Sequence, residues 1–355
     1  MSEPLLEIKE VHVEFEVRDG TVHAVDGISY TVNRGETIGI IGESGCGKSV
    51  TAKAAMQMLP KPGKVTGGEI LYHRRDKFDP SKPTEVVNIT HLHPDGKVIR
   101  SIRGGEFAMI FQEPMSSLTP VYTTGTLIGE ALHLHRKIPV TVGEHMSEQI
   151  SKYRAVTKEE AREIAIDMLQ KVGIPKPHER VDVYPHQLSG GQRQRVMIAI
   201  ALSCEPFMLI ADEPTTALDV SIEAQILDLM RELQSNTEMS IMFITHNLGV
   251  IAEMSDDVIV MYMGDVVESA DVDSLFYDPH HPYTRMLLKS IPQVGKKSNK
   301  LLQPIKGIVP DPFNIPQGCP FWPRCPSVMP GVCDSEEPAS FKVDDGHEAK
   351  CHLYR

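Results

Sequence analysis

The sequence contains no run of apolar residues long enough to cross a lipid bilayer. A spanning helix needs about 18 or more consecutive apolar residues, and none of the 355 residues begins such a stretch. The N-terminal segment is acidic and strand-like, so it also lacks the basic-then-apolar order of a secretory signal. These absences predict a soluble, cytoplasmic protein that meets a membrane only through partner proteins.

Basic residues are in the minority. The chain has 36 Lys and Arg against 48 Asp and Glu, a net charge of -12, which argues against a surface that coats nucleic acid. The sequence also has no internal repeat and no heptad array, so a solenoid or a long coiled coil is excluded. The remaining composition suits one large α/β domain with an appendage.

Short apolar runs alternate with helical patterns along most of the chain. The runs at residues 37–41, 207–211 and 241–245 are typical of buried strands, and helical patterns occupy 50–59 and 221–234. This alternation predicts a mostly parallel sheet that is covered on both faces.

Other stretches have different patterns. Alternating residues predict strands at 5–15 and 27–32, and the polar stretch 73–104 predicts an inserted hairpin or loop. The pattern from 123 to 202 is mostly helical. Beyond residue 292 the chain becomes rich in Pro, Gly and Cys, so we place a domain boundary after residue 290.

A glycine-rich motif follows the first apolar run. Residues 42–49 read G-E-S-G-C-G-K-S and match a phosphate-binding loop, in which backbone N–H groups and a helix N-terminus converge on one point. Lys48 would reach the β- and γ-phosphates, and Ser49 would ligate Mg²⁺. A glycine turn with an exposed lysine is the alternative, and the position between a strand and a helix favours the phosphate loop.

Two carboxylates end a second buried strand, at Asp212 and Glu213. Asp212 would hold Mg²⁺ directly or through water, and Glu213 would polarise the water that attacks the γ-phosphate. An acidic strand terminus at the surface is the alternative.

Leu188-Ser189-Gly190-Gly191-Gln192 stands directly before another helical pattern. A serine and two glycines there make a second anion-binding helix start, or an ordinary Ser-capped helix. Two phosphate-binding helix starts in one chain indicate a nucleotide sandwiched between two subunits.

Together with Gln112, Ala217-Leu218-Asp219 and His246, these motifs form an ordered set that resembles ABC transporter ATPases over about residues 5–290. The resemblance implies an α/β P-loop fold with a mostly parallel core sheet, an antiparallel β subdomain and a helical subdomain at about 123–203. It implies ATP and Mg²⁺ as cofactors. A subunit that no longer hydrolyses ATP is expected to lose Glu213 or His246, and both are present.

The resemblance also implies individual roles. Gln112 would touch Mg²⁺ or the attacking water, His246 would contact the γ-phosphate and order Glu213, and Asp219 would communicate across a dimer. The implied catalytic residues are Lys48, Gln112, Glu213 and His246, and the implied Mg²⁺ ligands are Ser49, Gln112 and Asp212. The implied nucleotide contacts are Phe15, Gly42, Ser44, Gly45, Cys46, Gly47, Lys48, Ser49, Val50, Ser189, Gly190, Gly191, Gln192 and Asp219. Phe15 would stack on adenine, with an ordinary core position as the equal alternative.

The type of transporter follows from further segments. Four segments resemble the D-type ATPase of oligopeptide/dipeptide permeases. They are His281-Pro282-Tyr283-Thr284 and residues 316–326, 110–118 and 211–216. This implies an F-type ATPase as heterodimer partner, two permease subunits, a solute-binding protein, and a peripheral position on the cytoplasmic face of the inner or plasma membrane. Peptides are the implied cargo, and the family also serves oligosaccharides and nickel chelates. The polar stretches 73–104 and 138–157 are longer than usual for the family.

Four cysteines gather near the C-terminus, at Cys319, Cys325, Cys333 and Cys351. Four thiolates can bind Zn²⁺ or a [4Fe–4S] cluster, and the resemblance favours the cluster. Four reduced cysteines are the alternative. The polar loop with His91 and His93 is not read as a metal site.

A non-transport ATPase of the same superfamily, acting on nucleic acid or ribosomes, is the main rival interpretation. Such proteins commonly have two ATPase halves in one chain or a long coiled coil. This chain has one motif set and an acidic balance.

Overall fold

The computed structural model describes residues 3–76, 81–112, 118–139, 153–215, 218–290, 305 and 307–355. It divides into two compact units, each assembled from separate stretches of the chain. The first unit comprises residues 1–3, 73–86 and 92–241, and the second comprises residues 4–72, 87–91 and 242–355.

An antiparallel sheet forms one part of the second unit. Its strands are β1 (Pro4–Val17), β2 (Gly20–Asn33) and β4 (Gly63–Arg74), with β1 between the other two. Buried side chains of β1 alternate with half-buried or exposed ones along much of its length, as one covered face requires. The strands predicted at 5–15 and 27–32 are therefore confirmed, and both are longer than predicted.

The buried sheet of this unit contains β3 (Thr37–Ile41), which is parallel to β11 (Asp257–Tyr262). Every residue of β3 is buried, as expected for a strand covered on both faces. Helix α1 (Lys48–Ala55) follows β3 and ends earlier than predicted, because Gln57 adopts a left-handed φ of 51°. Helix α9 (Leu248–Met254) packs on β3.

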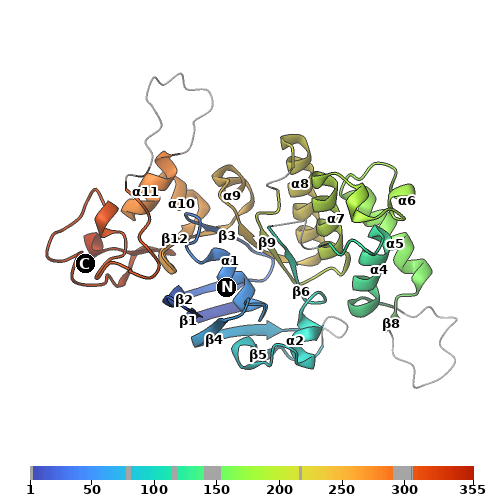
Figure 1. The fold of residues 1–355 in the computed structure, drawn as a ribbon, viewed down its shortest axis with the longest axis horizontal. Coiled ribbons are helices and arrows are strands. Elements are labelled where there is room, and N and C mark those ends of the chain that lie inside the picture. Colours follow the sequence, from blue (N-terminus) through green and yellow to red (C-terminus); the bar gives the residue numbers. More distant parts are fainter. Residues whose placement is uncertain are drawn as a thin grey trace. The chain divides into compact units, whose positions relative to one another are not determined.

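The C-terminal residues extend the same sheet. Strand β12 (Asp265–Asp271) pairs with β11 on one side and with β14 (His347–Lys350) on the other, and β14 pairs with β13 (Ser340–Asp344). Figure 1 shows this red segment beside β12 and α11. Helices α10 (Val272–Tyr277) and α11 (Pro282–Lys289) precede it. Residues 307–355 pack within the same unit as β3. This grouping does not test the domain boundary at residue 290, which stays a prediction.

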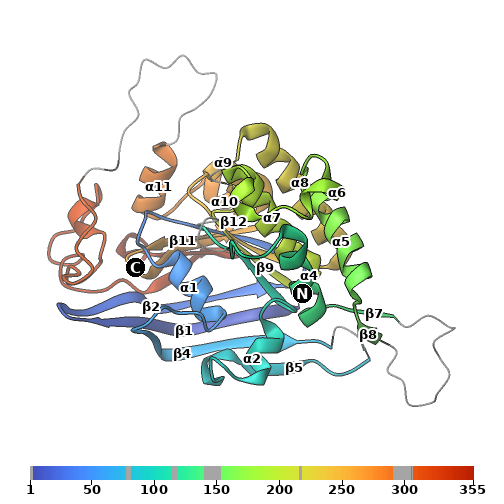
Figure 2. The same ribbon diagram turned by 45° about the vertical axis from the view of Figure 1, so that its right-hand side comes forward.

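The first unit contains a parallel strand pair and a group of helices. Strands β6 (Phe107–Ile110) and β9 (Met208–Asp212) are parallel and largely buried. Helices α4, α5 and α7 pack against one another, as both ribbon views show (Figures 1 and 2). In the described residues of this unit the helices are α2 (Lys97–Ile102), α4 (Thr124–His135), α5 (Lys158–Lys171), α6 (Pro177–Arg180), α7 (Gly190–Ser203) and α8 (Val220–Thr237). Strand β10 (Ser240–Ile244) is where the chain passes into the second unit.

Two predicted stretches differ from the structure in part. The polar stretch 73–104 contains β5 (Glu85–Asn88), which lies next to β4 as an inserted hairpin requires, but also the unpredicted helix α2 (Lys97–Ile102). That helix forms because Ile99 and Ile102 are fully buried on one face. Within the stretch predicted to be mostly helical, β7 (Lys137–Pro139) and β8 (Tyr153–Ala155) form a short antiparallel pair.

The described residues also include four short 3₁₀ helices. They are η1 (Ile89–His91), η3 (Pro185–Gln187), η4 (Trp322–Arg324) and η5 (His352–Tyr354). No helix in the described ranges is both long and apolar enough to cross a bilayer.

Candidate functional site

The glycine-rich loop joins β3 to α1 in the second unit. Gly42 and Gly47 have left-handed φ values of 151° and 102°. A Cβ on Gly42 would lie 2.2 Å from the Met261 carbonyl oxygen, and one on Gly47 would lie 2.4 Å from the Ala24 carbonyl oxygen. Any side chain at these two positions would displace the backbone, so the loop requires glycine there. Gly45 also has a positive φ, of 82°, but faces open space.

Lys48 folds back over this loop. Its Nζ donates hydrogen bonds to the carbonyl oxygens of Gly42, at 2.8 Å, and Glu43, at 2.9 Å. The Cys46 sulfur lies 3.5 Å from the same nitrogen, and burial raises the pKa of the Cys46 thiol. The lysine charge is therefore held at the mouth of the loop, where a phosphate group would meet it.

The start of α1 completes this loop. Gly47 is the N-cap residue and provides no side-chain cap hydrogen bond. Ser49 and Val50, in the first turn, are half-buried, and Ser44 is exposed. This arrangement is suited to binding an anion.

Two further predicted residues belong to the same unit. Phe15 on β1 is half-buried, and its ring packs against Gly63 of β4, where an added Cβ would lie 2.4 Å from the ring. His246 is exposed and directly follows Thr245, whose hydroxyl accepts a hydrogen bond from the Asn247 N–H at 3.0 Å. The structure thus places Phe15 in the antiparallel sheet and His246 at the carboxyl end of β10.

The two carboxylates lie in the first unit. Asp212 is the last residue of β9 and is 3 % exposed, while Glu213 is half-buried and adopts a left-handed φ of 49°. A glutamate in this conformation is strained, and such strain is typical of functional sites.

The segment after Glu213 is held by residues that sequence reasoning missed. Gln194 on α7 is fully buried and donates a hydrogen bond to the Pro214 carbonyl, and the Thr215 hydroxyl donates to Glu223 at 2.7 Å. The available signal was a glutamine that continues the mostly apolar buried face of α7, because a buried amide needs a specific partner.

Ser189 caps helix α7. Its hydroxyl accepts a hydrogen bond from the Gln192 N–H at 3.3 Å, and the Gln192 side chain accepts one from the Ser189 N–H at 3.1 Å. Ser189 and Gly190 are exposed, and Gly191 and Gln192 are half-buried. The segment is therefore a capped helix start with an open face.

The last two predicted residues of the first unit are also exposed. Asp219 caps α8, where its Oδ1 accepts a hydrogen bond from the Ile222 N–H at 3.0 Å. Gln112 follows β6. Of the motifs around them, residues 113–117, Thr216 and Ala217 lie outside the described residues.

The four C-terminal cysteines are close enough to affect one another. Burial, together with the like charges of the other three thiols, raises the pKa of Cys319 to about 11. The Cys319 N–H donates to the Cys333 carbonyl at 2.9 Å. In the part of the chain that the structure describes, however, no group of three or more His, Cys, Asp or Glu side chains is placed to hold a metal ion. The structure therefore does not support the predicted metal site.

Comparisons with known proteins agree with this geometry. Residues 25–216 match the family described as ABC transporter, and residues 267–333 match the C-terminal region of oligopeptide/dipeptide transporters. The dipeptide transport ATP-binding protein DppD of Bacillus subtilis is 45% identical over 99% of this chain and 95% of its own length. DppD of Escherichia coli is 42% identical over 98% of this chain and 96% of its own length.

A solved structure extends the comparison. The dimeric structure of MJ0796, described as a bacterial ABC transporter cassette, superposes with a TM-score of 0.61 at 25% identity, over 76% of this chain and 99% of the other. The match to the ABC transporter family covers both the phosphate loop and the capped helix α7. The chain therefore belongs to the ATP-binding subunits of ABC transporters, in the oligopeptide/dipeptide permease family.

Proposed function

We propose that this chain hydrolyses ATP to drive the import of dipeptides and oligopeptides through membrane permeases. The observation that carries the proposal is the loop at residues 42–49, in which Gly42 and Gly47 leave no room for a side chain and Lys48 folds back over the loop. The relatives named as dipeptide and oligopeptide transport ATP-binding proteins support the cargo class.

Nucleotide binding would begin at this loop. Lys48 would donate to oxygens of the β- and γ-phosphates while its two carbonyl acceptors hold it in place, and the N–H groups of the loop and of the first turn of α1 would bind the same phosphates. Ser49 and Asp212 would hold Mg²⁺, which supplies charge neutralisation on the phosphates when it is bound. Phe15 would stack on the adenine ring.

Hydrolysis would depend on residues that position one water molecule. Glu213, which has a left-handed backbone conformation, would accept the proton of that water as it attacks the γ-phosphate. Gln112 and His246 would orient the water and the γ-phosphate. Catalysis is then mostly positioning and electrostatic stabilisation, as is general for phosphoryl transfer.

Closure of two ATPase subunits on ATP would convert binding into movement. Ser189, Gly190 and Gly191 would bind the γ-phosphate of the nucleotide on the partner subunit, and Asp219 would contact that subunit. The partner is an F-type ATPase, and both would dock on two permease subunits supplied by a solute-binding protein. The chain would then lie on the cytoplasmic face of the membrane as a peripheral subunit.

Uptake in whole cells tests the proposal. Cells that carry the complete transporter are compared with cells in which Glu213→Gln replaces the natural residue, using labelled dipeptide, labelled oligopeptide, an oligosaccharide and a nickel chelate. We expect the substitution to abolish uptake of the dipeptide and the oligopeptide. Uptake of the oligosaccharide and of the nickel chelate should be unaffected. Loss of oligosaccharide or nickel uptake alone would contradict the peptide cargo.

We also propose the C-terminal segment 291–355 as a separate extension of the ATPase domain 1–290, with its four cysteines as ligands of a [4Fe–4S] cluster or of Zn²⁺. The gathering of four cysteines near the C-terminus and the mutual effect of the thiols on the pKa of Cys319 support this proposal. Because the side chains are not placed around a common centre, binding would require local rearrangement. Iron, acid-labile sulfide and zinc assays of anaerobically purified protein test it, and absence of all three would contradict it.

A further inference from the structure

Glu43 is the second residue of the phosphate loop, and its N–H, its carbonyl and its carboxylate each form hydrogen bonds. Its carbonyl accepts from Lys48 at 2.9 Å, and its N–H donates to the Tyr283 hydroxyl at 2.9 Å. Its carboxylate receives two hydrogen bonds from Arg324, at 2.6 and 2.9 Å. Tyr283 lies on α11, and Arg324 lies in η4 of the C-terminal segment. Residues far along the chain therefore hold one position of the loop.

The Arg324–Glu43 pair is well removed from solvent. The Arg324 side chain is 3% exposed and the Glu43 side chain 24% exposed. Arg324 also donates to the Tyr262 hydroxyl at 3.3 Å. A two-pronged guanidinium–carboxylate pair fixes both distance and orientation, and loss of one partner leaves a buried charge without compensation.

An aromatic cluster supports these hydrogen bonds. The ring centroids of Tyr262 and Tyr283 lie 4.8 Å apart, and Phe321 lies 5.2 Å from the first ring and 5.4 Å from the second. All three side chains are fully buried. Since Phe321 precedes η4 by one residue, the same packing that buries these rings also places Arg324.

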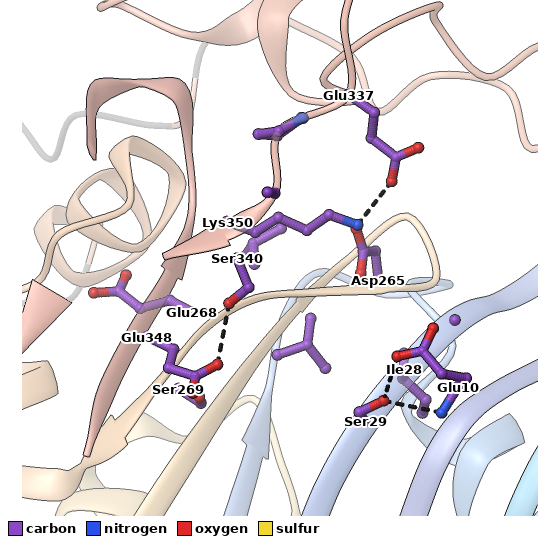
Figure 3. A pocket seen from close by; sticks show the side chains of 15 residues that line it. Glu10, Ile28, Ser29, Asp265, Glu268, Ser269, Glu337, Ser340, Glu348 and Lys350 are labelled. Atoms are coloured by element: carbon purple, nitrogen blue, oxygen red, sulfur yellow. Dashed lines mark hydrogen bonds and ion pairs between the residues drawn. The ribbon is translucent and has the colours of Figure 1, made fainter. Parts of the chain in front are cut away.

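The C-terminal segment is itself anchored on the sheet. Figure 3 shows Lys350 of β14 beside Asp265 and Glu337 at a cavity of about 470 Å³, with distances of 2.6 and 2.7 Å. On the other side of β14, His347 bonds to Glu268 at 2.8 Å, and both are buried. Arg324 thus extends from a segment that is paired to β12, so its position relative to the loop is fixed.

We propose that Arg324 is a positioning residue for the phosphate loop, through which the C-terminal segment sets the affinity of the chain for nucleotide. Arg324 fixes the Glu43 carboxylate, and Tyr283 fixes the Glu43 N–H. Together they place the Glu43 carbonyl, which is one of the two acceptors that locate Lys48. The inference rests on the proposed binding of nucleotide phosphates at this loop.

Equilibrium binding of MgATP and MgADP to the full chain, measured by calorimetry, tests the proposal. We expect Arg324→Ala to raise both dissociation constants ~10-fold or more, since a buried two-pronged pair is lost. Arg324→Lys keeps the charge but only one contact, so we expect an intermediate value. The charge exchange Glu43→Arg with Arg324→Glu should recover part of the affinity. In steady-state hydrolysis by the full chain, Arg324→Ala should raise KM more than it lowers kcat.

Arg355→Ala is the matched control. Arg355 forms a pair with Glu336 at 2.7 Å within the same C-terminal segment, but both side chains are more than half exposed. We expect this substitution to leave both dissociation constants unchanged. An equal loss of affinity in Arg324→Ala and Arg355→Ala would show a general effect of the segment and would contradict the proposal.

Tyr283→Phe tests the same claim if Arg324→Ala fails to fold. It removes only the hydroxyl that accepts the Glu43 N–H, and we expect the dissociation constant for MgATP to rise about threefold, as the loss of one hydrogen bond implies. Wild-type affinity in folded Arg324→Ala, or in Tyr283→Phe where Arg324→Ala does not fold, would overturn the inference alone. If the wild-type chain itself did not bind MgATP, the proposed function would fail as well.

Discussion

Ser189 and Gln192 cap each other at the start of α7, with the serine hydroxyl 3.3 Å from the Gln192 N–H and the glutamine side chain 3.1 Å from the Ser189 N–H. A hydroxyl that accepts one hydrogen bond still has its own O–H to donate. The capping function and contact with a phosphate oxygen are therefore compatible. Thr157 and Glu160 make the same reciprocal cap on α5, at 3.3 and 2.8 Å.

This pair of caps gives a matched test of the proposed role of Ser189. Ser189→Ala and Thr157→Ala should each lower the free energy of unfolding by about 1 kcal/mol, because each removes one N-cap. Only Ser189→Ala should also weaken ATP-dependent association with the partner ATPase, measured by analytical ultracentrifugation with MgATP. Equal association of the two variants would show that Ser189 does no more than cap its helix.

Glu213→Gln should nearly abolish hydrolysis and leave nucleotide binding intact. An amide cannot accept the proton of the attacking water, so we expect kcat to fall ~100-fold or more, while the dissociation constant for MgATP stays within about twofold. Phosphate release and equilibrium binding measure the two quantities.

Glu238→Gln is the control for Glu213→Gln. Glu238 ends α8 in the first unit with a left-handed φ of 53°, and it is exposed. It shares the residue type and the backbone strain but has no proposed role in catalysis. Normal hydrolysis by the Glu213→Gln variant would contradict the assignment of the general base.

Gly47→Ala should disrupt the phosphate loop. The added Cβ would lie 2.4 Å from the Ala24 carbonyl in a residue with φ of 102°, so we expect MgATP binding to weaken more than tenfold and stability to fall by about 1–3 kcal/mol. Gly346→Ala is the control, because Gly346 also has a positive φ, of 75°, but has open space around it. It should cost ~1 kcal/mol and leave binding unchanged. Normal MgATP affinity in folded Gly47→Ala would show that the loop tolerates the side chain.

Stability should fall in acid because of His281. This histidine is 1% exposed, and its Nδ1 accepts a hydrogen bond from the Tyr283 N–H at 3.1 Å, so the folded protein holds it neutral. Burial, with a smaller effect of Arg285, lowers its pKa from 6.5 to about 3. The resulting stability is present above pH 6.5 and is lost as the pH falls from there towards 3, with a slope of up to ~1.4 kcal/mol per pH unit.

Urea unfolding between pH 5 and pH 7.5 measures that slope. His281→Asn can still cap α11 but does not titrate, so we expect a smaller loss of stability in acid. His93→Asn is the control, because His93 accepts the Asp95 N–H at 3.1 Å in the same local geometry but is exposed. An unchanged slope in His281→Asn would assign the acid sensitivity to other groups.

Local patterns were sufficient to predict much of the fold. The buried strand β3 begins and ends where predicted, because the charged residue before its apolar run and the glycine after it mark the two ends of the strand. The serine and glutamine three residues apart at positions 189 and 192 are likewise a capping box that can be read from sequence. Helix α2 was missed because the polar residues around Ile99 and Ile102 conceal a narrow apolar stripe.

Contacts between distant segments were not accessible in this way. Glu43 and Arg324 are 281 positions apart, and neither residue type is unusual in its local sequence. The pairing of β14 with β12 and the burial of Phe321 help to bring the arginine to the loop. The phosphate loop was therefore predictable from its motif, whereas the residues that hold it in place were not.

The most direct test is a cryo-EM map of the closed assembly of Glu213→Gln with its partner subunits, ATP and Mg²⁺. We predict that Lys48 of this chain contacts the β- and γ-phosphates of one ATP, while its Ser189 lies within hydrogen-bonding distance of the γ-phosphate of the other ATP, bound to the partner. A closed assembly in which Ser189 contacts no nucleotide, or contacts the same ATP as Lys48, would contradict the account.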